Sequence, residues 1–476
     1  MSKPKLPDGF VVVVKRDCET CQTVVPVLQQ LAAATDLTVY TQDDPDFPGD
    51  PAAIYDADLS VSWHYEIETV PTLIRVVEGE QVDRTFGWLR TAWEEFTGID
   101  GLGEGLPPMR PGCGSKSVDP DLVDELNVRH GGSVLRSRRI EVADAEDEIE
   151  MMFTRGWTDG LPVVPPTEQR VLKMLTGTSR APDEIVATVP PDLVDITVEK
   201  VAISAVMAGC LPEYMPWVLT AVEAVCNDEF NMHGLLATTM PVAPVLVCSG
   251  HGTRAIGMNS GINALGQGNR ANSTIGRALQ LIVRNVGGGR PGEVDRAAHG
   301  SPAKLSFCFA ENDAESPFGS LAGQHGIEPG VDAITVFAGE GPRGLVDQLS
   351  RTPESLANSL AAQLQVMHHH KLVLSFDAIL VIGPEHARVL AGWDRDRILF
   401  ELHMRLTTPA AELERGADGI AEGIPVGMST ADLPKFHPDG LMLAYAGGGA
   451  GLFSTIIPGW VNGEMGSKPV TRQVRY

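Results

Sequence analysis

The chain has 476 residues and a formal net charge of −25 at pH 7, with 62 acidic against 37 basic side chains. A surface this acidic argues against nucleic acid or an anionic membrane as a partner, because both attract basic surface. The length predicts about two to four domains.

Cysteine use and hydropathy indicate the compartment. The seven cysteines include one closely spaced pair, which is typical of a reducing compartment rather than of a disulfide framework. The N-terminus lacks a signal-peptide core, and prolines and polar residues interrupt the longest uncharged run, residues 230–253. We therefore expect a cytoplasmic protein without a membrane span.

The first predicted strand leads directly into the paired cysteines. Residues 10–14 form an unbroken apolar run typical of a buried strand, and an amphipathic helix follows Cys21. Cys18 therefore lies at a helix N-terminus, where unpaired backbone N–H groups favour a thiolate. Cys21 is one helical turn away, so the two sulfurs can close a disulfide, with Cys18 attacking and Cys21 resolving.

This part of the chain resembles the thioredoxin family. The resemblance depends on the Cys-x-x-Cys motif between strand and helix, on Pro26 five residues past the second cysteine, and on residues 70–72, Val-Pro-Thr, before a strand. It implies a thioredoxin fold over residues 1–101, a redox-active disulfide, and a cis Pro71 that faces the cysteines.

The motif also departs from the thioredoxin pattern. Asp17 replaces the usual Trp, and Glu19-Thr20 replace Gly-Pro. The acidic neighbours disfavour a Cys18 thiolate while Lys15 and Arg16 favour it, so the sequence leaves the redox potential open. A zinc half-site and a pair of inert core cysteines are the alternatives to a redox role.

The rest of the first domain is predicted as a strand, a hairpin and a closing helix, over residues 37–40, 73–77 with 81–86, and 91–97. Residues 102–136, which begin with a Gly/Pro-rich stretch, are predicted to be a linker. Cys113 lies in this linker between two glycines and near Lys116, so its thiol could be exposed, partly ionised and able to exchange with Cys18. The alternative is an incidental linker thiol.

Residues 137–476 are predicted to form a large α/β domain with a mixed sheet, divided at most into two lobes, about 137–349 and 350–476. Apolar helical periodicity over residues 198–207 and 215–225 predicts buried helices. Cys210 and Cys226 follow these helices, and we interpret both as core thiols.

A loop rich in glycine and asparagine precedes a predicted helix that begins near residue 271. Free N–H groups at the start of the helix, with Arg270 and Arg277 beside them, favour a carboxylate or phosphate on a ligand. Asn269 and Asn272 belong to the same candidate substrate site. The alternative is a structural loop whose asparagines bond their own backbone.

Ionisable residues stand at both ends of a short apolar strand, residues 305–310. His299 and Lys304 precede the strand and Glu311 follows it. Cys308 faces the side opposite to the flanking phenylalanines. If the phenylalanines face the core, Cys308 faces His299 or Glu311, and a thiol beside a base is the arrangement of an activated nucleophile. Lys304 would then contact an anionic substrate. A plain core cysteine is the alternative.

Two predicted strands of the C-terminal third, residues 372–382 and 441–446, run into glycine-rich turns. Ligands of α/β sheets bind outside the carboxyl ends of strands, which places both turns, and His386 in the first, on the rim of a candidate substrate site. The consecutive histidines 368–370 project in different directions, so we predict no metal site from these three.

Residues 156–475 resemble a family of actinobacterial thioredoxin-fused proteins whose other members lack the thioredoxin part. The resemblance depends on residues 156–167, 266–276, 285–293, 307–312 and 383–386. Genes of that family often stand beside short selenocysteine or cysteine proteins, which are similar to the reductase subunit that acts on glycine derivatives. The resemblance implies thiol-dependent chemistry and such a small partner protein, without a defined reaction.

These features together predict a cytoplasmic thiol-dependent oxidoreductase. In this hypothesis Cys18 and Cys21 deliver electrons to a large domain that holds a small anionic substrate, with Cys308 or Cys113 as the internal acceptor. The predicted reaction is reductive cleavage of a carbon–heteroatom bond. A thioredoxin-reductase-type protein would supply the electrons, and we expect a homo-oligomer.

Two other classes of function stay open. The large domain could be a metal-assisted hydrolase or lyase that uses histidines, with the first domain only keeping it reduced; the candidates are His233, His251, His299 and His386. Alternatively, the first domain serves only as a docking module for a partner subunit.

Overall fold

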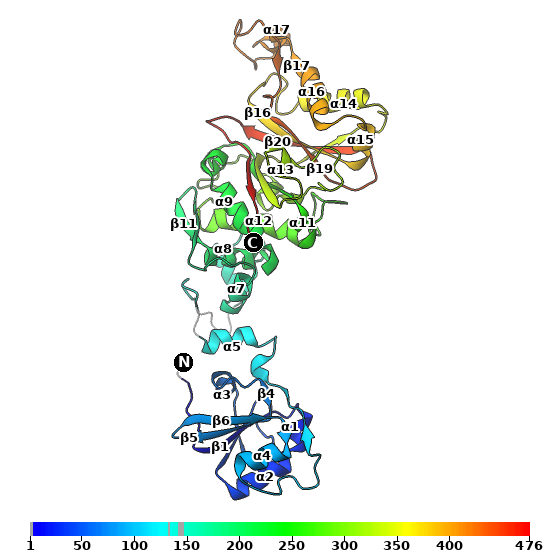
Figure 1. Cartoon of the computed structure of the whole chain (residues 1–476). Helices are drawn as coiled ribbons and strands as arrows, with labels where there is room; N and C mark the ends of the chain where they lie inside the picture. The colour runs from blue at the N-terminus through cyan, green and yellow to red at the C-terminus, as the bar shows by residue number, and fades with distance from the viewer. Residues whose placement is uncertain (1–2, 132–133, 141–146) are drawn as a thin grey trace. The chain divides into compact units, whose positions relative to one another are not determined.

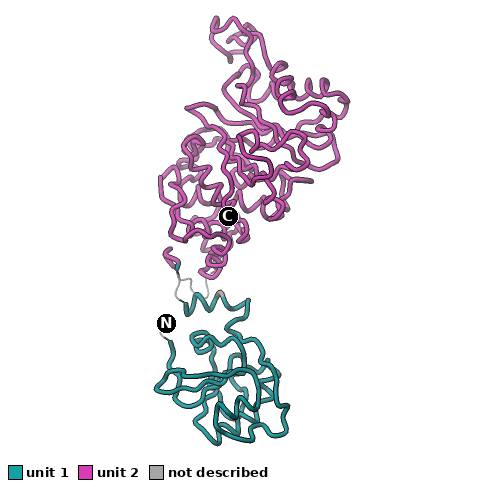
Figure 2. The backbone as a smooth tube through the Cα atoms, viewed as in Figure 1, with its two compact units in different colours: residues 1–134 teal, residues 135–476 magenta. Residues whose placement is uncertain are grey.

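The computed structural model describes residues 3–131, 134–140 and 147–476. The chain divides into two compact units, Met1–Val134 and Leu135–Tyr476 (Figure 2). Both units contain helices, and the main sheet of each combines parallel with antiparallel strand pairs, so the predicted α/β class is confirmed.

Unit 1 contains a five-stranded sheet (Figure 1) in the order β3 (Ala53–Tyr55), β2 (Leu37–Thr41), β1 (Gly9–Val14), β5 (Thr72–Val77), β6 (Glu80–Phe86). The valines of β1, residues 11–14, are buried on both faces, as expected of a central strand. β2 pairs with β1 in parallel, and β5 pairs with it antiparallel.

The helices of unit 1 are α1 (Glu19–Thr23), α2 (Val25–Ala34), α3 (Ser60–His64), α4 (Arg90–Thr97) and α5 (Val123–His130). Pro26 lies in the first turn of α2, where a missing backbone N–H costs nothing. The predicted strand at 37–40, the hairpin and the closing helix are confirmed to within one residue.

Most of the segment predicted as a linker, residues 102–136, belongs to unit 1. The indole N–H of Trp88 donates to the carbonyl of Pro107 (2.7 Å), and Arg90 donates to those of Gly103 (2.8 Å) and Leu106 (2.7 Å). Two short strand pairs follow: β7 (Trp88–Leu89) with β8 (Met109–Arg110), and β4 (Thr69–Val70) with β9 (Cys113–Gly114). In this segment the glycines and prolines allow close backbone packing instead of forming a linker. The boundary between the two units falls at residue 134. Residues 132 and 133 lie outside the described residues.

The first half of unit 2 is mainly helical: α6 (Glu148–Thr154), α7 (Glu168–Leu175), α8 (Val198–Ala208), α9 (Met215–Val225), α10 (Met232–Ala237), α11 (His251–Ala255) and α12 (Arg270–Asn285), with the hairpin β10 (Ile185–Val189) and β11 (Val194–Thr197). Helices α8, α9 and α12 share one hydrophobic core, so both predicted buried helices are confirmed.

An eight-stranded mixed sheet occupies the rest of unit 2. Its main path runs β13 (Cys308–Ala310), β12 (Ala243–Ser249), β14 (Ala333–Gly339), β20 (Phe453–Val461), β16 (Phe376–Ile382), β19 (Leu441–Tyr445), with β15 (Arg343–Val346) on β20 and β21 (Val470–Gln473) on β14. The sheet continues across residue 350, so the two lobes considered from the sequence share one sheet and form one compact unit.

The remaining elements pack around this sheet or extend from it: α13 (Leu321–Gln324), α14 (Pro353–Gln365), α15 (Pro384–Val389), α16 (Arg395–Arg405), α17 (Ala410–Leu413) and the pair β17 (Thr407–Thr408) with β18 (Leu433–Pro434). Among the described residues, no helix has the length and apolar character needed to cross a membrane.

A buried lysine connects the long segment between β16 and β19 to the turn that precedes β16. Lys435 is 2 % exposed, and its ammonium group donates to the carbonyls of Met367 (3.0 Å), His369 (2.7 Å) and Leu372 (2.8 Å). One side chain therefore satisfies three carbonyl groups in the turn before β16.

Replacing Lys435 should destabilise unit 2. Lys435→Met leaves three carbonyls without this donor, and we expect the free energy of unfolding to fall by about 3 kcal/mol. The matched control Lys468→Met removes an exposed ammonium group that pairs with Glu229, and should cost less than about 0.5 kcal/mol. Urea unfolding followed by tryptophan fluorescence measures both, and equal losses would contradict the role given to Lys435.

Candidate active site around Cys18

The side chain of Cys18 lies where strand β1 gives way to helix α1. Cys18 is the N-cap of α1, with an extended backbone (φ −151°, ψ 111°). Its Sγ accepts a hydrogen bond from the backbone N–H of Cys21, with an N···S distance of 3.2 Å. The predicted position of Cys18 at a helix N-terminus is confirmed, and the sulfur itself serves as the cap.

Strand β4 forms the opposite wall of the site. The peptide bond between Val70 and Pro71 is cis, as the resemblance implied. The carbonyl oxygen of Val70 lies 3.6 Å from Cys18 Sγ, within reach of a hydrogen bond from the thiol form. The backbone just before Pro71 therefore contacts the sulfur of Cys18.

The thiols of Cys18 and Cys21 differ in their pKa. A hydrogen bond from the thiol of Cys21 is the main cause that lowers the pKa of Cys18 to about 5; burial opposes it, while Cys113 and the backbone add to it. Burial and the same hydrogen bond raise the pKa of Cys21. At neutral pH Cys18 is a thiolate and Cys21 a thiol, which is the distribution that an attacking and a resolving cysteine need.

Asp43 and Asp44 contact the residues that precede Cys18. The carboxylate of Asp43 accepts the backbone N–H groups of Arg16 (2.7 Å) and Asp17 (2.8 Å). The guanidinium of Arg16 pairs with Asp44 at 2.7 Å. The main causes that lower the pKa of Cys18 are sulfur and backbone donors, and the acidic and basic neighbours weighed from the sequence are not among these main causes.

Residues 109–114, which we call the strap, lie over Cys18. Strand β9 in the strap pairs antiparallel with β4 and places Cys113 opposite Val70. The hydroxyl of Thr20 in α1 donates to the carbonyl of Pro111 at 2.6 Å. Cys18 is only 3 % exposed, whereas Cys113 is half-buried.

Alkylation of Cys18 should follow its low pKa. Because iodoacetamide reacts with thiolates, its rate at Cys18 should rise with pH through a midpoint near 5 and level off above pH 7. Cys21→Ala removes the main donor and should move this midpoint upward. Mass spectrometry of the alkylated peptides measures both rates, with Cys226, whose pKa burial raises to about 12, as the unreactive control. An unchanged midpoint in Cys21→Ala would contradict the assignment.

In unit 2, Cys308 lies beside a second thiol. Its Sγ is 3.8 Å from that of Cys248 on the neighbouring strand β12. Phe307 and Phe309 belong to a different hydrophobic cluster from Cys308, so the predicted alternation of sides is confirmed. The hydrogen-bond partner of Cys308 is Cys248, and not His299 or Glu311, and burial raises the pKa of Cys248. This arrangement matches the core-cysteine interpretation.

Glu311 lies at the end of β13 and is fully buried. Its carboxylate accepts hydrogen bonds from the hydroxyl of Ser249 and from the backbone N–H of Leu321 (2.8 and 3.0 Å to the two oxygens). Burial raises the pKa of Glu311 to about 8 in spite of these donors.

This pKa predicts a pH dependence of stability. Between about 4.5 and about 8 the folded chain holds a proton on Glu311 that the unfolded chain has released, so stability falls as pH rises through this window. The slope is at most about 1.4 kcal/mol per pH unit. Glu311→Gln removes the titration, so its stability relative to wild type should increase from pH 5 to pH 8. Urea unfolding of both proteins at several pH values tests this, and parallel curves would contradict it.

The cations predicted to bind an anionic substrate have internal partners. Arg277 donates to both carboxylate oxygens of Asp159 at 2.8 Å, and Lys304 reaches both oxygens of Asp295 at 2.9 Å. Arg270 donates to the carbonyl of Gly209 at 2.9 Å. The geometry therefore gives no support to an anion site made from these three side chains.

The asparagines of the same loop bond to its backbone. Asn269 caps α12 by accepting the N–H of Asn272 (3.0 Å), and it donates to the carbonyl of Gly257 (2.8 Å). Asn272 is buried and bridges the backbone at Asn259 and Ala264. This is the structural alternative that the sequence left open.

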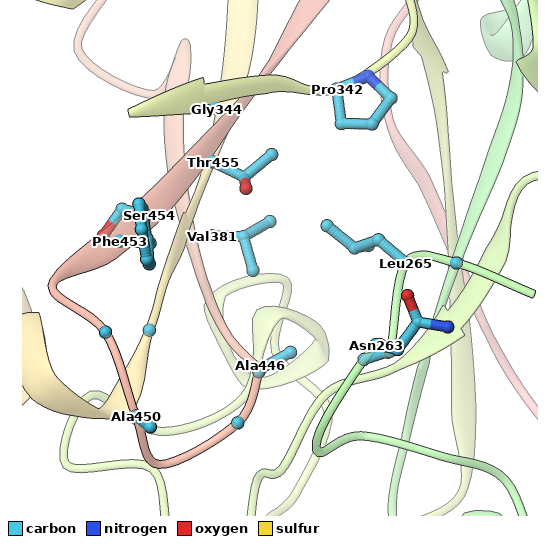
Figure 3. A pocket seen from close by; sticks show the side chains of 16 residues that line it. Asn263, Leu265, Pro342, Gly344, Val381, Ala446, Ala450, Phe453, Ser454 and Thr455 are labelled. Carbon is cyan, nitrogen blue, oxygen red and sulfur yellow. The ribbon is translucent and has the colours of Figure 1, made fainter. Parts of the chain in front are cut away.

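The loop also forms one wall of a pocket of about 430 Å³ (Figure 3). The other walls are residues 342 and 344 at the start of β15, residues 381 and 383 at the end of β16, the turn at 446–451 after β19, and residues 453–455 of β20. Asn263, Leu265, Val381 and Thr455 surround the cavity in Figure 3. The pocket therefore lies at the carboxyl ends of β16 and β19, where the sequence placed a site rim, but none of the described residues that line it is charged.

His386 lies behind the pocket wall. It is fully buried, and its imidazole contacts the hydroxyl of Ser454 (2.8 Å) and the carbonyl of Asp347 (3.2 Å) through its two nitrogens. Both nitrogens are thereby engaged, so His386 holds α15 against β20 and is not available to a substrate in this arrangement.

Sequence reasoning missed Cys248 and Ser249, which end strand β12 beside Cys308 and Glu311. The sequence contained a signal for this site, because residues 243–249 form an apolar run that ends in a thiol and a hydroxyl side chain. Only the parallel pairing of β12 with β13 shows that the two strand ends meet. The strap was missed because its pairing partners are two-residue strands.

Within the described part of the chain, no group of three or more His, Cys, Asp or Glu side chains is arranged to hold a metal ion. No protein-family model, curated protein or solved structure gives a significant match to the chain.

Proposed function

We propose that the protein is a thiol–disulfide oxidoreductase whose redox centre is Cys18 and Cys21 in a thioredoxin-like unit 1. The observation that carries the proposal is the hydrogen bond from the N–H of Cys21 to Cys18 Sγ at the start of α1. A thiolate held by backbone and thiol donors, beside a second cysteine that keeps its proton, is the arrangement that disulfide exchange requires.

In the proposed reaction the thiolate of Cys18 attacks one sulfur of a disulfide and releases the other as a thiolate. The protonated Cys21 then loses its proton and attacks Cys18 Sγ, which closes an internal disulfide and releases the second substrate thiol. The two protein thiols are oxidised by two electrons and the substrate disulfide is reduced by two. An electron donor of the thioredoxin-reductase type, in the cytoplasm, would restore the dithiol.

The reaction of unit 2 stays a prediction. We propose the neutral pocket beside Thr455 as its ligand site, because the pocket lies where α/β sheets bind ligands. A small anionic substrate, reductive cleavage of a carbon–heteroatom bond, a small selenocysteine or cysteine partner protein and a homo-oligomer all remain expectations. The metal-assisted alternative gains no support from His386, since both of its ring nitrogens are engaged.

Disulfide reduction by the full chain tests the proposal. With dithiothreitol as the reductant and a chromogenic aromatic disulfide as the substrate, Cys18→Ser should reduce the protein-dependent rate to background, because it removes the sulfur whose low pKa makes it the attacking thiolate. The control Cys226→Ser should keep the wild-type rate. Equal rates for Cys18→Ser and wild type would overturn the proposal.

A further inference from the structure

The strap is bonded to both sides of the redox centre, to strand β4 and to helix α1. On one side its β9 pairs with β4, and on the other the carbonyl of Pro111 accepts the hydroxyl of Thr20 in α1. Arg110 adds a hydrogen bond to Thr23 (3.1 Å) and an ion pair with Glu19 (3.2 Å). A segment bonded both to the helix of Cys18 and to the strand before Pro71 lies across the reactive sulfur.

This pairing fixes the place of Cys113. Cys113 stands directly opposite Val70 in the antiparallel ladder, and the carbonyl of Val70 is the group that lies 3.6 Å from Cys18 Sγ. Directly opposed residues of an antiparallel pair have Cα atoms about 4.5–5.5 Å apart. Cys18 and Cys113 thus contact the same residue, and Cys113 packs against the hydrophobic cluster that contains both Cys18 and Val70.

We propose that Cys113 is the third cysteine of the redox centre and forms a disulfide with Cys18, so that the strap behaves as a substrate tethered to its own enzyme. The proposal rests on the disulfide exchange proposed for Cys18. It gives the strap the position that an extended peptide with a reactive cysteine would take at β4.

The exchange balances with a low-molecular-weight disulfide as oxidant. Cys18 attacks the disulfide and forms a mixed disulfide, releasing one small thiol. Cys113 then loses its proton, attacks Cys18 Sγ and releases the second small thiol. The two protein sulfurs give up two electrons and Cys113 gives up one proton, and the small disulfide becomes one thiol and one thiolate.

Accessibility distinguishes Cys113 from Cys21. Cys21 has no exposed surface, whereas Cys113 is half-buried. An incoming reductant can therefore attack Cys113 Sγ and expel Cys18 as the thiolate, and a sulfur of low pKa is the better leaving group. Cys113 is in this way the entry point for electrons, and Cys21 resolves the mixed disulfides that form on Cys18.

Oxidation of the full-length Cys21→Ser protein with glutathione disulfide tests the proposal. After tryptic digestion without reductant, mass spectrometry should find the peptides that hold Cys18 and Cys113 joined by a disulfide. The double variant Cys21→Ser/Cys113→Ser should instead keep glutathione on Cys18. Cys226→Ser, a thiol substitution in unit 2, should match the wild type.

The outcomes separate the two proposals. If Cys21→Ser yields only the glutathione adduct on Cys18, exchange at Cys18 stands and the role of Cys113 is overturned. If Cys18 remains unmodified in every variant, the proposed function itself fails.

A second variant tests the strap without touching a cysteine. A Cβ at Gly112 would lie 2.2 Å from Cγ2 of Thr69 and 2.8 Å from the carbonyl oxygen of Val70, so Gly112→Val should displace the strap. We expect a several-fold faster reaction of Cys18 with a bulky maleimide and a lower yield of the Cys18 to Cys113 disulfide. Unchanged values of both would overturn the proposal.

Discussion

The hydrogen bond from the N–H of Cys21 to the sulfur of Cys18 joins the fold of unit 1 to its chemistry. It exists because a buried central strand ends just before a helix, and the first N–H groups of that helix have no carbonyl partners within it. Cys18 occupies the capping position that serine, threonine, aspartate or asparagine usually takes. The same contact therefore ends a strand, starts a helix and favours a thiolate.

Local patterns were sufficient for this part of the chain. The run of β-branched residues before the cysteines and the spacing of the motif act over a few residues, and both predicted their elements correctly. The cis bond before Pro71 was implied by the resemblance to thioredoxins and not by the local pattern. The balance of charges around Cys18 was harder to judge, because the guanidinium of Arg16 pairs with Asp44, and the carboxylate of Asp43 accepts the backbone N–H groups of Arg16 and Asp17, more than one element later in the chain.

The candidate sites of unit 2 show why composition alone was not sufficient there. Arg277 and Lys304 look like anion-binding residues in the sequence, but Asp159 and Asp295 neutralise them, and Asp159 lies 118 positions from Arg277. A loop of asparagines and glycines looks alike whether its polar groups face a ligand or its own backbone, and Asn272 faces the backbone. The location of the pocket was predictable, because the carboxyl ends of strands follow from the strands themselves; its neutral lining was not.

The pairing of β9 with β4 holds Cys113 near Cys18 within one chain, so the rate at which these two cysteines meet does not depend on the protein concentration. Two cysteines on separate molecules meet at a rate that dilution lowers, whereas two on adjoining backbone segments meet at an effective concentration that the fold itself sets. A chain that carries both sulfurs can respond to the oxidant around it in the same way whether the cell holds few copies or many.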